Sequence, residues 1–192
     1  MDWNFMDGGF CMTGLKRGSV KLEAHQSGWQ KEAENTIAEL KCIFENIATD
    51  IQHIGSTAVS SIHAKPIIDI AVGVKNPEDV FPFIEELNKK NYIFRGEDVP
   101  GQLLLVKGDF KKDTRTHHIH VIKWNGTEWK NYIDFRDYLN AFPEKAAEYD
   151  ECKQKLAKRF PDNRKLYTEG KKKLIAELIE EVKVWKTKRP NC

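Results

Sequence analysis

The feature that most constrains the fold is residues 67–74, IIDIAVGV, which are β-branched or small and almost wholly apolar. Such a run predicts a strand that is buried on both faces of a sheet. Asp69 interrupts the run, and a carboxylate buried among isoleucines costs on the order of several kcal/mol unless it is paired or binds a cation. Asp69 is therefore expected to be either a metal ligand or the structural partner of a nearby donor.

Apolar residues elsewhere follow the periods of helices and of further strands. Helical spacing covers residues 29–47 and residues from 129 onward, and a second helix begins at Asn76-Pro77 with acidic residues in its first turn. The other predicted strands are residues 51–54, 92–95, 103–107 and 118–123. This order predicts an α/β (α+β) fold in which helices flank a mixed sheet, with a helical C-terminal third.

Residues 1–19 have neither a helical nor a strand period, and they contain four glycines. We expect them to form a flexible leader, with ordered structure beginning at Val20. Residues 20–192 contain no internal repeat, low-complexity tract or linker. At this length they predict a single domain.

The composition is that of an ordinary globular protein. Hydrophobic residues make up 40% of the chain and charged residues 31%. There is no run of 18 apolar residues and no secretory signal, so the sequence predicts no membrane partner. The four cysteines are far apart and form no CxxC pair, which argues against a structural zinc site or a disulfide framework and favours the cytoplasm.

Positive charge is concentrated near the C-terminus. The chain carries a net charge of +2, but from Lys145 onward it has 14 Lys and Arg against 8 Asp and Glu. A basic segment attracts phosphates or nucleic acid. Charged helices more commonly present such residues to solvent, so this distribution gives only weak support for a nucleic-acid partner.

The strand at residues 51–54 runs into the turn Gly55-Ser56-Thr57. A strand that ends in Gly-Ser exposes backbone N–H groups and a hydroxyl, which suit phosphate oxygens. The chain then has room to loop back so that Asp69 lies in an adjacent strand. Lys65 would meet the phosphate beside this turn, or else be a solvated loop lysine.

Residues 53–70, HIGSTAVSSIHAKPIIDI, resemble the signature of the GrpB family, a branch of the nucleotidyltransferase superfamily. Three downstream segments match the family in the same order, and the resemblance covers about residues 20–185. They are His118-Ile119-His120-Val121, Phe135-Arg136-Asp137-Tyr138-Leu139 and Tyr167-Thr168-Glu169-Gly170-Lys171.

The resemblance implies a nucleotidyltransferase-like fold whose carboxylates hold a divalent metal, Mg²⁺ or Mn²⁺, against a nucleoside triphosphate. Asp69 would be the catalytic acid. Arg136, Tyr167 and Lys171 enter as ligand-binding residues only through the resemblance. Arg136 and Lys171 would supply the cationic wall that a triphosphate requires.

The sequence departs from the superfamily pattern two residues after Asp69, where a second acid is expected and Ala71 stands. The place of a third acid, on a neighbouring strand, falls among His118 and His120, which share a strand face. One carboxylate and two imidazoles suit zinc, manganese or iron better than Mg²⁺. The three residues are thus candidate metal ligands, and the alternative is that the histidines hydrogen-bond one another and Asp69.

The residues therefore point to a pocket for a nucleotide or another phosphorylated small molecule together with a divalent metal. One hypothesis is metal-dependent nucleotidyl transfer with Asp69 as ligand. A second is a non-catalytic binding module that lost the second acid at position 71. A third is a metal-dependent hydrolase that uses Asp69, His118 and His120.

Overall fold

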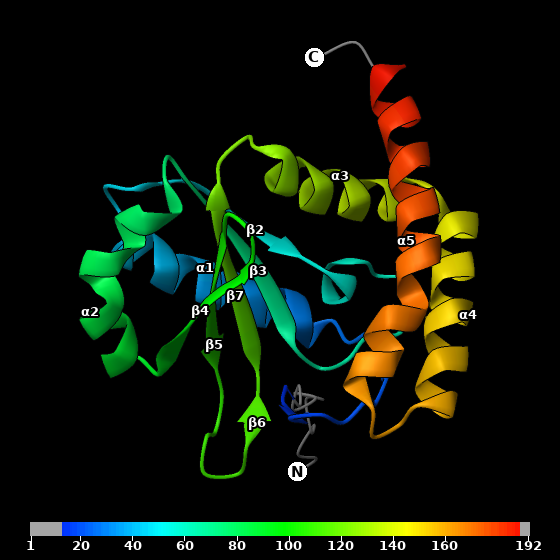
Figure 1. The fold of residues 1–192 in the computed structure, drawn as a ribbon, viewed down its shortest axis with the longest axis horizontal. Helices are drawn as coiled ribbons and strands as arrows, with labels where there is room; N and C mark the ends of the chain where they lie inside the picture. The colour runs from blue at the N-terminus through cyan, green and yellow to red at the C-terminus, as the bar shows by residue number, and fades with distance from the viewer. Residues whose placement is uncertain (1–12, 189–192) are drawn as a thin grey trace, which may run out of the picture.

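A computed structural model describes residues 13–188 of the chain and is built around a five-stranded sheet (Figure 1). Its strands, in spatial order, are β2 (Ala48–Ile54), β3 (Ile68–Val74), β7 (His117–Lys123), β5 (Gln102–Lys107) and β4 (Tyr92–Val99). β3 and β7 are parallel, and all other neighbours are antiparallel. The mixed sheet and its five predicted strands are confirmed, and residues 68–74 of the central run form β3.

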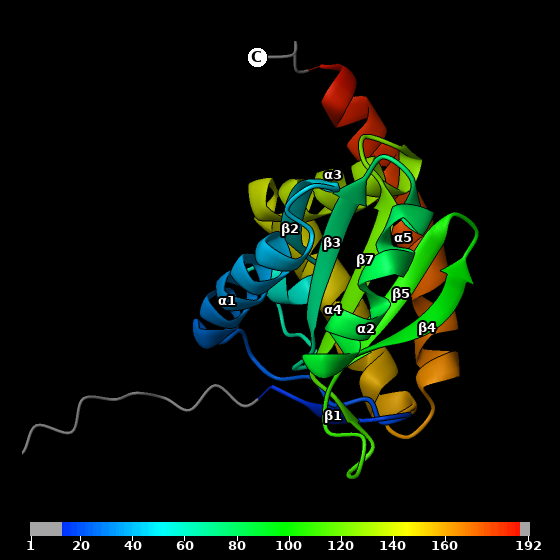
Figure 2. The ribbon, with the colours of Figure 1, turned by 90° about the vertical axis from the view of Figure 1, so that its left-hand side faces the viewer.

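One face of the sheet is covered by α1 (Gly28–Ile43), the 3-10 helix η2 (Pro77–Phe83) and α2 (Ile84–Lys89) (Figure 2). The predicted helix start at Asn76 is confirmed, because its backbone N–H donates to the Asp79 carboxylate at 3.1 Å. The main apolar core lies between this face and the helices. It includes Trp29, Leu40, Ile70, Val72 and Val121.

The opposite face is crossed by α3 (Thr127–Ala141), onto which α4 (Pro143–Arg159) and α5 (Arg164–Thr187) pack as a helical pair (Figure 1). A small core lies between α3 and the sheet, and a second one lies among the three helices. The predicted helical C-terminal third is confirmed. None of the helices in residues 13–188 combines the length and apolar character needed to cross a membrane.

A separate two-stranded sheet pairs β1 (Leu15–Lys16) with β6 (Thr114–Arg115). The predicted leader therefore extends too far, because ordered structure begins before Val20. The pairing is nonlocal and involves only two residues of each strand, so no sequence period announces it. Residues 1–12 lie outside the described part of the chain.

Candidate functional site

The site begins where β2 ends. Gly55 follows this strand with φ 71°, a conformation that favours glycine. A Cβ atom at this position would lie 2.5 Å from Asp69 Oδ2, so glycine is also required by space. The close approach of this backbone to the carboxylate brings Ser56 and Thr57, at the start of the 3-10 helix η1 (Ser56–Ala58), to the edge of the site.

Asp69 and two histidines form a compact cluster across β3 and β7. In the parallel register Asp69 is opposite His118, and Ala71 is opposite His120. The Nδ1 atom of His118 is 3.0 Å from Asp69 Oδ1, and the Nε2 atom of His120 is 3.7 Å from the same oxygen. One donor atom from each of the three residues lies within 4.8 Å of the other two. The structure thus brings together all three predicted metal ligands.

The carboxylate of Asp69 is held in its charged form. Burial raises the pKa of this carboxyl, but hydrogen bonds and electrostatic interactions with His118 and His120 outweigh burial and hold the pKa well below its usual range. The Nδ1 atom of His120 is buried and has no hydrogen-bond partner among the described residues. A histidine that binds a metal usually donates its other ring nitrogen to an acceptor, and His120 lacks that support.

Ala71 lies on the same sheet face as Asp69, as the strand alternation predicts. It is fully buried and packs in a small apolar cluster with Ile54, Ile122 and Trp129. The position that would carry a second acid is therefore part of the packing between the sheet and α3. The described residues place one carboxylate, not two, at this point of the site.

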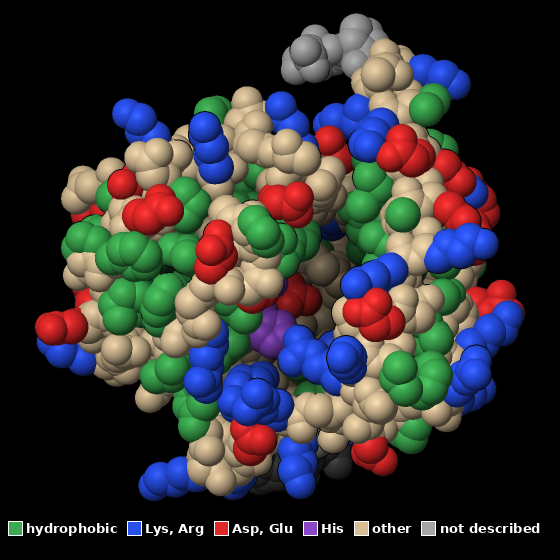
Figure 3. Space-filling view, viewed as in Figure 1, with side chains coloured by type: hydrophobic (Ala, Val, Ile, Leu, Met, Phe, Trp, Pro, Cys, Tyr) green, Lys and Arg blue, Asp and Glu red, His purple; other side chains and the backbone are tan. Residues whose placement is uncertain are grey.

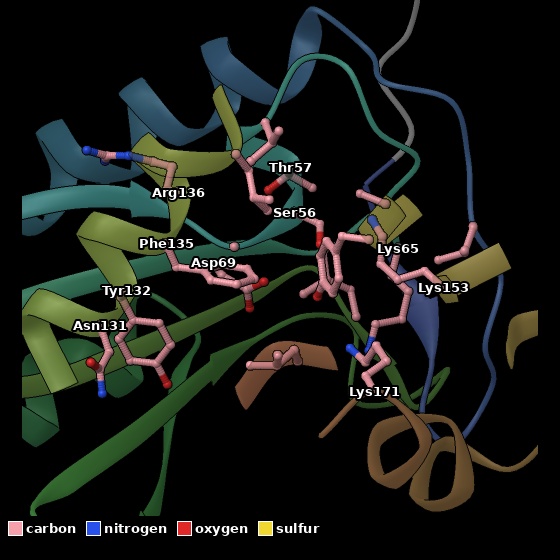
Figure 4. A pocket seen from close by; sticks show the side chains of 18 of the residues that line it. Ser56, Thr57, Lys65, Asp69, Asn131, Tyr132, Phe135, Arg136, Lys153 and Lys171 are labelled. Atoms are coloured by element: carbon pink, nitrogen blue, oxygen red, sulfur yellow. The ribbon is translucent and has the colours of Figure 1, made fainter. Parts of the chain in front are cut away.

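A cavity of about 370 Å³ opens between this end of the sheet and helices α3, α4 and α5. Figure 3 shows it as a central hollow in the surface, and Figure 4 shows the side chains that line it. All eight predicted catalytic and ligand-binding residues line the cavity: Gly55, Ser56, Thr57, Lys65, Asp69, Arg136, Tyr167 and Lys171. His118 and His120 contact Asp69 without lining the cavity themselves.

Lys65 and Lys171 form a cationic wall. Their ammonium nitrogens lie 5.6 and 4.6 Å from the ring centroid of Tyr167. Neither ammonium has an ion pair or side-chain hydrogen bond with another residue in the range 13–188. Burial, the largest cause, lowers the pKa of each to about 8; the charge of Arg164 acts in the same direction, and Asp69 opposes it.

Arg136 lines the cavity in a different way from the two lysines. Its Nη1 atom donates to Gln52 Oε1 at 3.0 Å and to the carbonyl oxygen of His53 at 2.8 Å. Its Nε and Nη2 atoms contact Asp137 Oδ1 at 2.8 and 2.7 Å. In Figure 4 the guanidinium points away from the cavity. Arg136 therefore tethers α3 to β2 and offers little free charge to a ligand.

Sequence reasoning missed Lys153, which also lines the cavity. This lysine is 1% exposed, donates a hydrogen bond to the carbonyl oxygen of His63 and lies 3.5 Å from Asp150 Oδ1. It lies four residues after Tyr149, which also lines the cavity. A lysine on the apolar face of a helix was the signal that could have revealed it.

Four aromatic residues in α3 and at its C-terminal end divide between two roles. Tyr138 and Phe142 pack against Trp185 in the helical core. Tyr132 and Phe135 instead line the cavity on the side opposite the lysines (Figure 4). Their ring faces give a ligand an apolar surface to stack against.

Comparison with known proteins extends over most of the chain. The model of the GrpB protein family matches residues 19–181. The Glutamate-rich protein GrpB of Alkalihalophilus pseudofirmus is 37% identical over 89% of this chain and 100% of its own length. The protein YqkA of Bacillus subtilis is 34% identical over 90% of this chain, which spans only 50% of YqkA.

Solved structures agree with the sequence comparison. The crystal structure of GrpB from Enterococcus faecalis has a TM-score of 0.79 and 33% identity, covering 86% of this chain and 99% of that one. A cytoplasmic RNA terminal U-transferase has a TM-score of 0.50 and 14% identity, covering 71% of this chain and 41% of that one. The second likeness shows that the fold is nucleotidyltransferase-like. The chain belongs to the GrpB family.

Proposed function

We propose that the chain binds a nucleotide or another phosphorylated small molecule in the cavity, together with one divalent metal ion. The observation that carries the proposal is the pair of unpaired ammonium groups, Lys65 and Lys171, in the cavity wall. Desolvated charges without partners cost stability. An anionic ligand that fills the cavity would supply the missing partner.

The shape and chemistry of the remaining wall support the same ligand class. Gly55 and Ser56 offer backbone N–H groups and a hydroxyl to phosphate oxygens beside Asp69. The ammonium groups of the lysines can add charge-assisted hydrogen bonds, which are strong contacts for phosphate. Tyr132 and Phe135 provide apolar surface for a ring. The volume of about 370 Å³ is in the range of small-molecule sites.

The donor set of Asp69, His118 and His120 suits a single ion such as Zn²⁺ or Mn²⁺. Such an ion would neutralise phosphate charge next to the strand-end turn and polarise a phosphoryl oxygen. Lys65 and Lys171 would orient the ligand, and Tyr132 and Phe135 would exclude water from it.

Nucleotidyl transfer is less well supported than binding. The solved neighbour is described as an RNA terminal U-transferase, but its likeness to this chain concerns the fold alone. Two-metal transfer needs several carboxylates to hold both ions, and Ala71 occupies the second acidic position. The His/Asp donor set leaves metal-dependent hydrolysis as the chemical alternative to binding.

A melting-temperature screen tests the proposal. ATP, GTP, CTP and UTP, each with Mg²⁺, Mn²⁺ or Zn²⁺, are added at saturating concentration, with each metal alone as the reference. A ligand that binds only the folded state stabilises it by about 2.7 kcal/mol at 100 times its Kd. We expect at least one combination to raise the melting temperature above that of the metal alone.

Two variants make the screen specific. Lys171→Gln should weaken binding by about 10- to 100-fold, as expected for the loss of one charge-assisted hydrogen bond. Lys89→Gln removes the same charge from the exposed end of α2 and should leave binding unchanged. If none of the nucleotides shifts melting, the nucleotide assignment fails. A null result that extends to inorganic phosphate and pyrophosphate would refute phosphate binding altogether.

A further inference from the structure

Residues 14–20 form a fixed loop beside the cavity. Their backbone hydrogen bonds join Gly14 N to Pro66 O (2.7 Å), Arg17 N to Asp113 O (2.9 Å), Arg164 N to Gly18 O (3.2 Å) and Val20 N to Pro161 O (2.6 Å). The loop turns at Gly18, whose φ of 89° favours glycine. Four bonds to separate parts of the chain hold this loop in one conformation.

This loop builds a second, small hollow that is rich in cations. The hollow has a volume of about 10 Å³ and is lined by Lys16, Arg17, Lys65, Arg115 and Arg164, together with Leu15, Gly18, Ser19 and Ile67. Figure 3 shows Lys and Arg side chains gathered along the lower rim of the central hollow. Within residues 13–188 no acidic side chain lines the small hollow.

The cations of the hollow differ in how they are paired. Arg115 lies 3.3 Å from Asp113 and donates to the carbonyl oxygen of Thr114, so its charge is partly satisfied. Lys16, Arg17 and Arg164 have no ion pair with any residue of the described chain. Like charges crowded in one place repel one another, and an anion bound between them would relieve that repulsion.

Lys65 and Ile67 line both the small hollow and the main cavity. The two spaces are therefore neighbours that share part of their lining. Burial is the main cause of the lowered pKa of Lys65, and the charge of Arg164, which lines the small hollow, lowers this pKa further.

We propose that Lys16, Arg17 and Arg164 form a second phosphate subsite for a ligand whose first phosphate lies in the main cavity. The proposal rests on the proposed function and extends it to the ligand class. The hollow is only large enough for a group the size of a water molecule, so it receives phosphate oxygens and no ring. The ligand thus carries a phosphate chain, or a second phosphate, that reaches past Lys65.

Calorimetric titration with inorganic phosphate and with tripolyphosphate, at fixed ionic strength, tests the subsite. Tripolyphosphate should bind the natural protein at least about tenfold more tightly than phosphate, because only the longer anion meets both sets of cations. The double variant Arg17→Gln/Arg164→Gln should lose about that factor for tripolyphosphate and keep its affinity for phosphate. Lys89→Gln serves as the control for the loss of net charge.

The outcomes separate the subsite from the main cavity. Equal weakening of both anions in the double variant would overturn the subsite, because it would reflect general electrostatics. Unchanged tripolyphosphate binding in the double variant would overturn the subsite as well. The proposed function would still stand in that case if the natural protein binds phosphate and Lys171→Gln weakens that binding. If the natural protein binds neither anion, both proposals fail. Arg17→Lys/Arg164→Lys, which retains the charges, should keep most of the tripolyphosphate affinity. The phosphate affinity that the Gln double variant retains verifies that this variant folds.

Discussion

Two groups of polar side chains on opposite sides of the sheet differ in how their charges are paired. On the α1 side, Glu39 accepts hydrogen bonds from the Tyr92 hydroxyl at 2.5 Å and from Lys107 at 3.0 Å. Lys107 also stacks over the Tyr92 ring at 4.4 Å. On the cavity side, Lys65 and Lys171 share an aromatic ring but have no carboxylate partner among the described residues.

The difference separates structural from functional charge. A partly buried ion pair that satisfies its hydrogen bonds, such as Glu39–Lys107, belongs to the architecture, and its removal costs stability. Partly desolvated cations that lack a carboxylate partner reduce the stability of the ligand-free protein, and proteins keep such groups mainly where a ligand completes them. The comparison makes the cavity, and not the Glu39 cluster, the place where a ligand is expected.

The largest effect is expected for Asp69→Asn. Loss of the only carboxylate in the donor set should abolish divalent metal binding, while the fold remains intact. Mass spectrometry of dialysed protein, with Asp162→Asn as an exposed acidic control, measures the metal content. A well-folded Asp69→Asn protein with unchanged metal content would rule out the site. If Asp69 instead serves only as the partner of the histidines, the variant should lose about 1–3 kcal/mol of stability.

A smaller effect is expected from pH. Because the pKa values of Lys65 and Lys171 are lowered to about 8 in the folded chain from 10.5, the folded protein binds fewer protons than the unfolded chain between these values. Two consequences follow above pH 8. The destabilisation that these lysines cause in the ligand-free fold is progressively relieved as pH rises, and affinity for a phosphate ligand falls as the ammonium groups lose charge.

Titration with a phosphate monoester between pH 7 and 9.5 checks this dependence, since the monoester keeps its charge over that range. Several-fold weakening is expected in the natural protein. Lys171→Arg should flatten the profile because arginine stays charged. A constant affinity for the natural protein across the range would mean that these lysines do not meet the phosphate.

Part of the site follows from sequence periods alone. The apolar run around Asp69 predicts a central strand, and the two-residue spacing of His118 and His120 places both imidazoles on one face. Both imidazoles lie close to Asp69 because β3 and β7 are neighbouring strands. The resemblance to the GrpB family added Tyr167 and Lys171, which lie far away in the chain.

The rest depends on tertiary contacts that leave no local pattern. Arg136 has the charge for a phosphate ligand, but Gln52 and Asp137 engage its guanidinium. Lys153 donates to the carbonyl oxygen of His63, 90 residues earlier in the chain, and no local period predicts that contact. The short strand β1 (Leu15–Lys16) exists only because a distant hairpin pairs with it, so its residues carried no signal of order.

Urea unfolding of the ligand-free protein tests the central claim most directly, by comparing Lys171→Met with Glu39→Gln. We predict that Lys171→Met is at least as stable as the natural protein to within about 0.5 kcal/mol, since removing the desolvated charge offsets the lost contact with Tyr167. Glu39→Gln should lose about 1–2 kcal/mol, because its hydrogen bonds are charge-assisted but its side chain is partly exposed. A loss of stability in Lys171→Met as large as that in Glu39→Gln would contradict the account, because Lys171 would then be a structural charge like those around Glu39.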